Sequence, residues 1–294
     1  MRYLDPKNDV AFKKIFADEN HKEILIHFLN SILDLDAPIK EVTILRHDQL
    51  PEIKDLKETS LDLKAKDEKN REFIIEMQVE KQKDFMNRAL YYAAKSYSKQ
   101  IKKADFYDQL NPVIFLGILD FNLFDGEDFL TQHYIVNKQT GNRDMTHLEF
   151  SFIELPKFNK TEKQCENLAD KWIYFMKNAD DLKFIPENIK SEEIKTAYEI
   201  SEQFGWTEGE LELYESRDRA VAAQKDKMNT AREEGLEKGR EEGLEKGREE
   251  GREEGIEKGR EEGEKNKELE LISNLMKAMS ISKVEAKKIL KINK

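Results

Sequence analysis

The sequence predicts an α/β fold, and three observations lead to this prediction. Residues 60–81 alternate apolar and polar side chains around a short polar loop, which is the pattern of two paired β-strands. Residues 113–120 form a continuous apolar run, which suits a strand covered on both faces. Before and between these segments, apolar residues recur at helical spacing. We therefore expect a sheet with helices packed on it.

Two helices precede the first strand. Asn8 or Asp9 can cap a helix that carries apolar side chains one turn apart. Residues 20–33 place apolar residues on one broad helical stripe. A first strand is predicted within residues 39–50, where apolar and polar residues alternate.

The rest of the globular part continues this pattern. A long helix is expected over residues 83–103, after the paired strands, and strands over residues 130–137 and 147–155 extend the sheet. Helices then dominate. Thr161 caps a segment with apolar residues at helical spacing, and Ser191 begins another.

The composition limits what kind of protein this is. Of 294 residues, 38% are hydrophobic and 38% are charged, which fits one globular domain with a polar extension. The formal net charge of −11 argues against a generally basic surface that coats nucleic acid. Part of this acidity is local, because residues 231–265 hold fourteen Glu against nine Arg and Lys.

Cysteine usage and hydropathy point to a soluble cytoplasmic protein. Cys165 is the only cysteine, which excludes an intramolecular disulfide and a thiolate metal cluster and suits a reducing compartment. No stretch approaches the roughly 20 consecutive apolar residues of a membrane span. The N-terminus lacks the apolar core of a signal peptide.

The two paired strands set two carboxylates opposite each other. If residues 67–71 form the loop, Lys66 pairs with Glu72 and Asp62 falls opposite Glu76. An odd loop length keeps all the apolar residues on one face, whereas an even length would put Asp62 in the core. The hydrophobic pattern therefore selects the register that brings these carboxylates together, with both strands half-buried.

Two interpretations of this pair remain open. Carboxylates on adjacent strands repel each other unless a positive charge lies between them, and a hard divalent cation such as Mg²⁺ prefers oxygen ligands from one or two carboxylates. The alternative is an ordinary solvated sheet face with alternating charges. The pattern that favours the first is Asp62, followed fourteen residues later by Glu76 and, after one intervening residue, by Gln78.

This pattern resembles the PD-(D/E)XK nuclease motif, in the branch with Gln in place of the usual Lys. That branch occurs in the Rpn family of recombination-promoting nucleases, also called PD-(D/E)XK family transposases. Residues 9–16, DVAFKKIF, resemble the family's opening D-x-x-F-K-x-x-F segment, and residues 88–92, RALYY, resemble its R-x-x-Y-Y helix. Residues 111–121 are similar to its following strand, and the Gly-rich charged tail is also typical. The resemblance covers the chain essentially end to end.

The resemblance implies a fold, an activity and a metal site. The fold is a restriction-endonuclease-like PD-(D/E)XK core, αβββαβ, with a mixed sheet flanked by helices and a helical C-terminal extension. The activity is that of a metal-dependent endonuclease that hydrolyses DNA phosphodiesters, with Mg²⁺ or Mn²⁺ as cofactor. Asp62 and Glu76 would hold the metal together with the backbone carbonyl of Met77. Gln78 is the third catalytic candidate, and its amide can position a water or a phosphate oxygen but carries no positive charge.

Five further residues are candidates for substrate binding. Arg88 and Tyr92 lie one helical turn apart, and Arg88 could contact a phosphate as a bidentate donor. The alternative is that Arg88 pairs with a nearby acid and Tyr92 belongs to the core. Asp9 and Lys13 form either a helix-surface ion pair or, by resemblance, the edge of the active site. Because Gln78 is neutral, either the metal carries more of the electrostatic work or Lys64 or Lys13 supplies the missing charge.

The chain is expected to divide into three parts. Residues 1–210 form the nuclease-like domain with a helical subdomain. Residues 211–265 form a charged helical or flexible tether in which glycine recurs every fourth residue from Gly235 to Gly263, each costing ~1 kcal/mol relative to Ala in a helix. Residues 266–294 form a short helical hairpin that docks a protein partner or a second copy of the chain, or alternatively a degenerate helix-turn-helix.

Other functions compete with the nuclease. A non-catalytic DNA-binding or assembly protein would retain the same fold, and the acidic balance and the missing Lys favour it. A true transposase, which takes part in DNA recombination, would join strands as well as cut them, and only the family's name suggests it. A homodimer fits the nuclease, because one metal site cuts one strand. DNA is the expected partner, and no membrane is.

Overall fold

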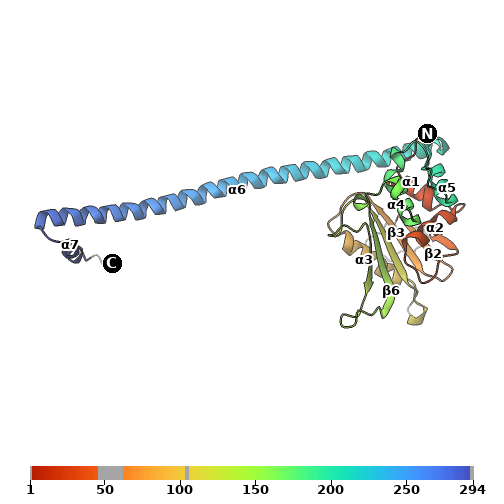
Figure 1. Ribbon diagram of the computed structural model, residues 1–294, viewed down its shortest axis with the longest axis horizontal. Helices are drawn as coiled ribbons and strands as arrows, with labels where there is room; N and C mark the ends of the chain where they lie inside the picture. Colours follow the sequence, from red (N-terminus) through yellow and green to blue (C-terminus); the bar gives the residue numbers. More distant parts are fainter. Residues whose placement is uncertain (1, 46–61, 103–105, 292–294) are drawn as a thin grey trace. The chain divides into compact units, whose positions relative to one another are not determined.

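One mixed sheet organises the chain. The computed structural model describes residues 2–45, 62–102 and 106–291 (Figure 1). Within them, six strands form a sheet in the order β1-β2-β3-β4-β6-β5. These strands are β1 (Val42–Leu45), β2 (Leu63–Asp67), β3 (Glu72–Gln78), β4 (Val113–Leu119), β5 (Leu130–Ile135) and β6 (Met145–Glu154). The chain therefore has the predicted α/β class and a mixed sheet.

Strand direction changes at β3. Strands β1, β2 and β3 pair antiparallel, whereas β4 is parallel to both β3 and β6. Strand β4 is buried at every position, as its continuous apolar run predicts for a parallel strand covered on both faces. The predicted strands over residues 130–137 and 147–155 are present as β5 and β6, which pair antiparallel and extend the sheet. The predicted first strand is present as β1, and the rest of that segment, residues 46–50 with His47, lies outside the described residues.

The loop between β2 and β3 has the predicted length. Lys66 pairs with Glu72, so residues 67–71 separate the last paired residues, although Asp67 itself still belongs to β2. The Asp67 carboxylate accepts hydrogen bonds from the backbone N–H groups of Lys69 and Arg71, and it pairs with Arg71 Nε at 2.6 Å. Asn70 takes the left-handed conformation, with φ of 63°, which asparagine tolerates better than most residues. These bonds fix the register of the hairpin.

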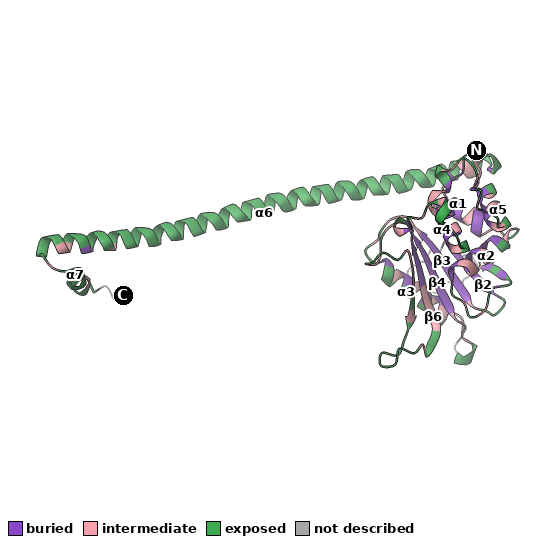
Figure 2. Cartoon of the chain, viewed as in Figure 1, coloured by how far each residue is buried: buried purple, intermediate pink, exposed green. Residues whose placement is uncertain are grey.

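Helices cover both faces of the sheet. Helices α1 (Asp9–Phe16), α2 (Lys22–Ile32), α4 (Leu168–Asn178) and α5 (Glu192–Ser201) share the larger core with the odd-numbered residues of β3. Helix α3 (Phe85–Ser98) packs on the opposite face, over a smaller core that contains Ile74 and Phe115. Figure 2 shows the resulting burial of the central strands.

The polar face of the hairpin is buried, which the sequence did not predict. Alternation predicted half-buried strands, yet Lys64, Glu72 and Glu76 on the even-numbered face are all buried. The prediction was wrong because α3 covers this face. The alternation of residues within the hairpin does not reveal that a helix from a later part of the sequence packs on it.

Most helix starts agree with the sequence, and one does not. Asn8 caps α1 by accepting a hydrogen bond from the Val10 N–H, and Ser191 caps α5. Thr161 was expected to cap the helix that carries Trp172, but it caps a single 3-10 turn. The chain leaves helical geometry at Cys165, and Asn167 caps α4 instead.

The C-terminal part is helical. The chain divides into two compact units, residues 1–223 and 224–294. Helix α6 (Glu208–Met279) runs through the glycine repeat, whose residues are exposed, and α7 (Lys283–Ile289) begins with a capping box between Ser282 and Glu285. The three-part division at residues 210 and 265 stays a prediction. Among the described residues, no helix is long and apolar enough to span a membrane.

A substitution at Gly117 of β4 can test the packing of the smaller core. It lies opposite Phe152, and a Cβ at this position would come within 2.8 Å of the Phe152 ring. We expect Gly117→Ala to lower the free energy of unfolding by about 1–3 kcal/mol because the ring must move in a packed core. Urea unfolding measures this loss. Gly205→Ala is the matched control, since its Cβ would meet no atom within 4 Å; equal stability of the two variants would contradict the packing described.

Candidate active site

The β2–β3 hairpin brings Asp62 and Glu76 together. Leu63 pairs with Ile75, so continuing the register by one residue sets Asp62 opposite Glu76. The Asp62 carboxylate accepts a hydrogen bond of 2.8 Å from the Met77 backbone N–H, which fixes its position beside β3. The juxtaposition inferred from the alternation is thus present in the fold.

Glu76 is a buried carboxyl group that forms no ion pair with the described residues. Its side chain is 3% exposed, and its Oε1 atom has no hydrogen-bond partner among the described residues. Burial and, secondly, the charge of Asp62 raise the pKa of Glu76 to about 8, although Arg88 and Lys13 oppose this shift. Burial also raises the pKa of Asp62, against the hydrogen bond from Met77. Without a cation, Glu76 therefore keeps its proton at neutral pH.

These two groups fit a hard divalent cation. The unpartnered oxygen of Glu76 is a ready acceptor, and a bound cation would replace the proton and relieve the repulsion between the carboxylates. In the described part of the chain, no cluster of three or more acidic, His or Cys side chains could hold a metal. Two carboxylates are enough for Mg²⁺, which usually keeps several waters and takes other ligands from substrate phosphates.

Gln78 and Arg88 form a polar pair beside the carboxylates. Gln78 ends β3, and its Oε1 accepts a hydrogen bond of 2.5 Å from Arg88 Nη2. Arg88 Nη1 donates to Gln82 Oε1, and the guanidinium group lies 5.9 Å from the centre of the Tyr92 ring. Arg88 is thus held by amide oxygens rather than by the acid that one interpretation predicted, and no described carboxylate forms an ion pair with it. Tyr92 is half-buried against it.

The other basic candidates differ in position. Lys64 lies beneath α3 in an ion pair of 2.8 Å with Glu72, which also accepts a hydrogen bond from Ser96. Lys13 pairs with Asp9 at 3.9 Å, the helix-surface pair that was one of two interpretations. Even so, the Lys13 charge opposes the rise in pKa of both Asp62 and Glu76. Lys13 therefore acts on the carboxyls through its charge, whereas Lys64 is paired with Glu72.

Two polar residues near this site were not predicted. Both carboxylate oxygens of Glu80 are enclosed and lack hydrogen-bond partners among the described residues. Glu80 continues the period of two after Glu76 and Gln78, so the alternation contained a signal for it. Gln82, which holds Arg88, follows the end of the strand, where no periodic pattern remains.

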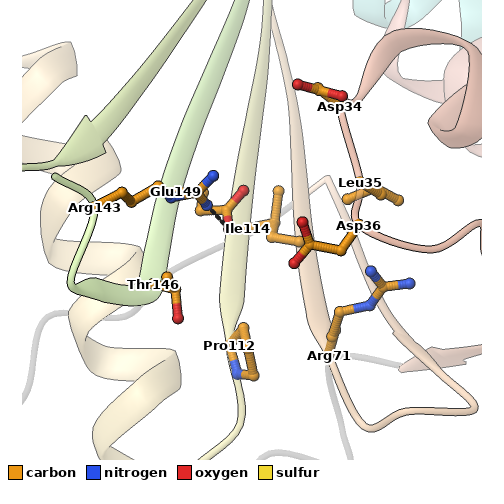
Figure 3. A pocket seen from close by; sticks show the side chains of 9 residues that line it. All are labelled: Asp34, Leu35, Asp36, Arg71, Pro112, Ile114, Arg143, Thr146 and Glu149. Atoms are coloured by element: carbon orange, nitrogen blue, oxygen red, sulfur yellow. Dashed lines mark hydrogen bonds and ion pairs between the residues drawn. The ribbon is translucent and has the colours of Figure 1, made fainter.

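A separate pocket lies toward the other ends of the same strands. Its lining includes Arg71 and Pro112, which precede β3 and β4, whereas Glu76 and Gln78 lie near the C-terminal end of β3 (Figure 3). Both of its arginines are paired with carboxylates of the protein. Arg143 pairs with Glu149, and Arg71 pairs with Asp67.

Comparison with known proteins identifies the family. A family model described as PD-(D/E)XK nuclease family transposase matches residues 6–231, a range that contains the whole sheet and each candidate residue of the site. The comparison with curated proteins found no match, and neither did the comparison with solved structures.

The burial of Glu76 predicts a stability effect in the metal-free protein. Glu76→Gln should raise the free energy of unfolding by about 3 kcal/mol at pH 7 in EDTA, because it removes a buried ionisable group whose pKa rises from 4.5 to about 8. Denaturant unfolding measures the change. Glu72→Gln, on the same strand and face, is the matched control. It should lower the free energy of unfolding by about 3 kcal/mol, because it leaves the buried Lys64 without its ion-pair partner.

The raised pKa of Glu76 predicts how the free energy of unfolding changes with pH. The unfolded carboxyl ionises near pH 4.5 and the folded one near pH 8, so the folded state holds an extra proton between these values. Stability of the parent protein should therefore fall as pH rises through this window, and the advantage of Glu76→Gln should grow with it. An advantage that stayed constant from pH 5 to pH 8 would contradict the assignment.

Proposed function

Because the chain belongs to the PD-(D/E)XK nuclease family transposases, we propose that it is a Mg²⁺- or Mn²⁺-dependent DNA endonuclease that hydrolyses phosphodiester bonds. One observation carries this proposal. Glu76 is buried opposite Asp62 with an oxygen that has no hydrogen-bond partner among the described residues. Such an arrangement lowers the stability of the metal-free protein, and a bound cation offsets that loss. Perturbed carboxyl groups of this kind cluster at functional sites.

Asp62 and Glu76 would hold the cation, with the Met77 carbonyl as the further ligand that the family implies. When bound, the cation neutralises charge on the phosphate and lowers the pKa of a water molecule, so that hydroxide is available at neutral pH. The hydrogen bond from the Met77 N–H fixes Asp62 beside the strand, and burial fixes Glu76. Both carboxylates are therefore positioned before the substrate arrives.

Gln78 and Arg88 together take the place of the usual Lys. The amide oxygen of Gln78 accepts from Arg88, which leaves its NH₂ group to donate to a water or a phosphate oxygen. Arg88 supplies the positive charge that an amide lacks, and Lys13 adds a second charge near the carboxylates. Tyr92 packs against the Arg88 guanidinium and limits its movement.

A non-catalytic DNA-binding or assembly protein is the second candidate, and the neutral Gln78 favours it. Metal binding separates the two functions. If Asp62 and Glu76 hold a cation, Mn²⁺ should raise the melting temperature of the parent protein, because a ligand that binds only the folded state stabilises it. Glu76→Gln should lose this rise. A protein in which the hairpin is purely structural would show no rise in either form.

Cleavage is tested on supercoiled plasmid. We expect the purified protein to nick plasmid with Mg²⁺ or Mn²⁺ and not in EDTA, and Asp62→Ala and Glu76→Gln to lower the rate at least about 100-fold, because several kcal/mol of charge stabilisation are lost. Asp144→Ala, an exposed acid between β5 and β6, is the matched control and should cut at the parent rate. Equal cutting by all four proteins would contradict the assignment, and joined products would indicate strand transfer.

A further inference from the structure

The segment after the hairpin is strongly basic in an acidic chain. Residues 85–103 contain one Arg and four Lys and no Asp or Glu, whereas the whole chain has a formal net charge of −11. Helix α3 forms most of this segment, and its C-cap is Lys99. The composition of the whole chain hides this local excess of positive charge.

The basic residues of α3 share one face of the helix with Tyr92. Arg88, Tyr92, Lys95 and Lys99 follow each other at intervals of four, three and four residues, which places them along one side of α3. Lys102 comes just after the helix and is exposed. These five residues are called the α3 stripe below.

The α3 stripe begins at the candidate active site. Arg88 contacts Gln78, and its charge acts on both Asp62 and Glu76. From there, the helical rise of 1.5 Å per residue carries the stripe about 16 Å to Lys99. That distance equals the rise of about five base pairs of duplex DNA.

The far end of the stripe concentrates like charges. Partial burial, and then the charges of Lys95 and Lys64, lower the pKa of Lys99. Glu72 faces them from β3 and neutralises Lys64 by a direct ion pair. A row of positive side chains along one helix face attracts the phosphates of a polyanion.

We propose that the α3 stripe binds the sugar–phosphate backbone of DNA and leads one strand to Asp62 and Glu76. The inference rests on the proposed nuclease function and adds Lys95, Lys99 and Lys102 to its substrate contacts. Contacts to phosphates carry no sequence information, so this binding is independent of sequence and weakens with salt. Because the rest of the chain is acidic, DNA is attracted to this face and repelled elsewhere.

Binding is measured by fluorescence anisotropy with the full chain and two labelled duplexes of unrelated sequence, in EDTA so that no cleavage occurs. We expect the triple variant K95A/K99A/K102A to bind both duplexes about tenfold more weakly or worse. The slope of log affinity against log salt should fall in magnitude by about 2–3, since each phosphate contact contributes roughly 0.9.

Two further variants control for charge and folding. K138A/K163A/K183A removes the same charge from exposed lysines outside α3 and should bind like the parent. K95R/K99R/K102R keeps the charge and should bind within a few-fold of the parent. Equal weakening by the two alanine triples, parent-like affinity of K95A/K99A/K102A, or no binding by the parent at low salt would overturn the proposal.

The outcome is separable from that of the nuclease proposal. If K95A/K99A/K102A loses DNA binding but the parent never cuts plasmid with Mg²⁺ or Mn²⁺, DNA binding by the α3 stripe is supported and the nuclease proposal is contradicted. If the parent cuts plasmid in a metal-dependent way while K95A/K99A/K102A keeps the parent affinity and salt slope, the nuclease proposal is supported and DNA binding by the α3 stripe is contradicted.

Discussion

The hydrogen bonds of the Asp67 carboxylate hold the β2–β3 loop in one conformation, and the arrangement of the site depends on them. They connect Asp67 to the N–H groups of Lys69 and Arg71 and to the Arg71 guanidinium. Because side chains along a strand alternate between two faces, the register set by this loop decides where every later residue points. It sends the odd-numbered apolar residues of both strands to the larger core, and Lys64, Glu72 and Glu76 to the face beneath α3.

The charges beneath α3 are stabilised in two different ways. Glu72 has Lys64 and Ser96 as close partners, so its charge is neutralised within the protein. Glu76, four residues along the same strand, faces another carboxylate and has an oxygen without a partner in the described chain. The first arrangement is complete without a ligand and the second is not. On this single strand, the charge of Glu72 therefore stabilises the fold, whereas Glu76 is suited to bind a ligand.

Local patterns predicted what depends on neighbours in the sequence. The α/β class, the Lys66–Glu72 pairing and the buried strand β4 follow from apolar periodicity and loop length. The burial of the polar strand face and the bond between Arg88 and Gln78 could not be predicted, because both depend on how α3 docks on the sheet. The sequence suggested Gln78 and Arg88 separately and gave no reason to join them. The catalytic and metal-binding roles of the candidate residues remain predictions.

The two faces of the sheet differ in how firmly they are covered. Four helices contribute to the larger core, whereas α3 is the one described α-helix over the other face, where it rests on a smaller cluster. Elements with few buried contacts open at lower free energy than the rest of a domain. A fluctuation that lifts α3 would separate Arg88 from Gln78 and take the basic stripe away with it, while the sheet stayed intact. Substrate contacts on this helix therefore depend on packing over a smaller core than the one on the opposite face, and a ligand that clamps α3 in place would make the site more rigid.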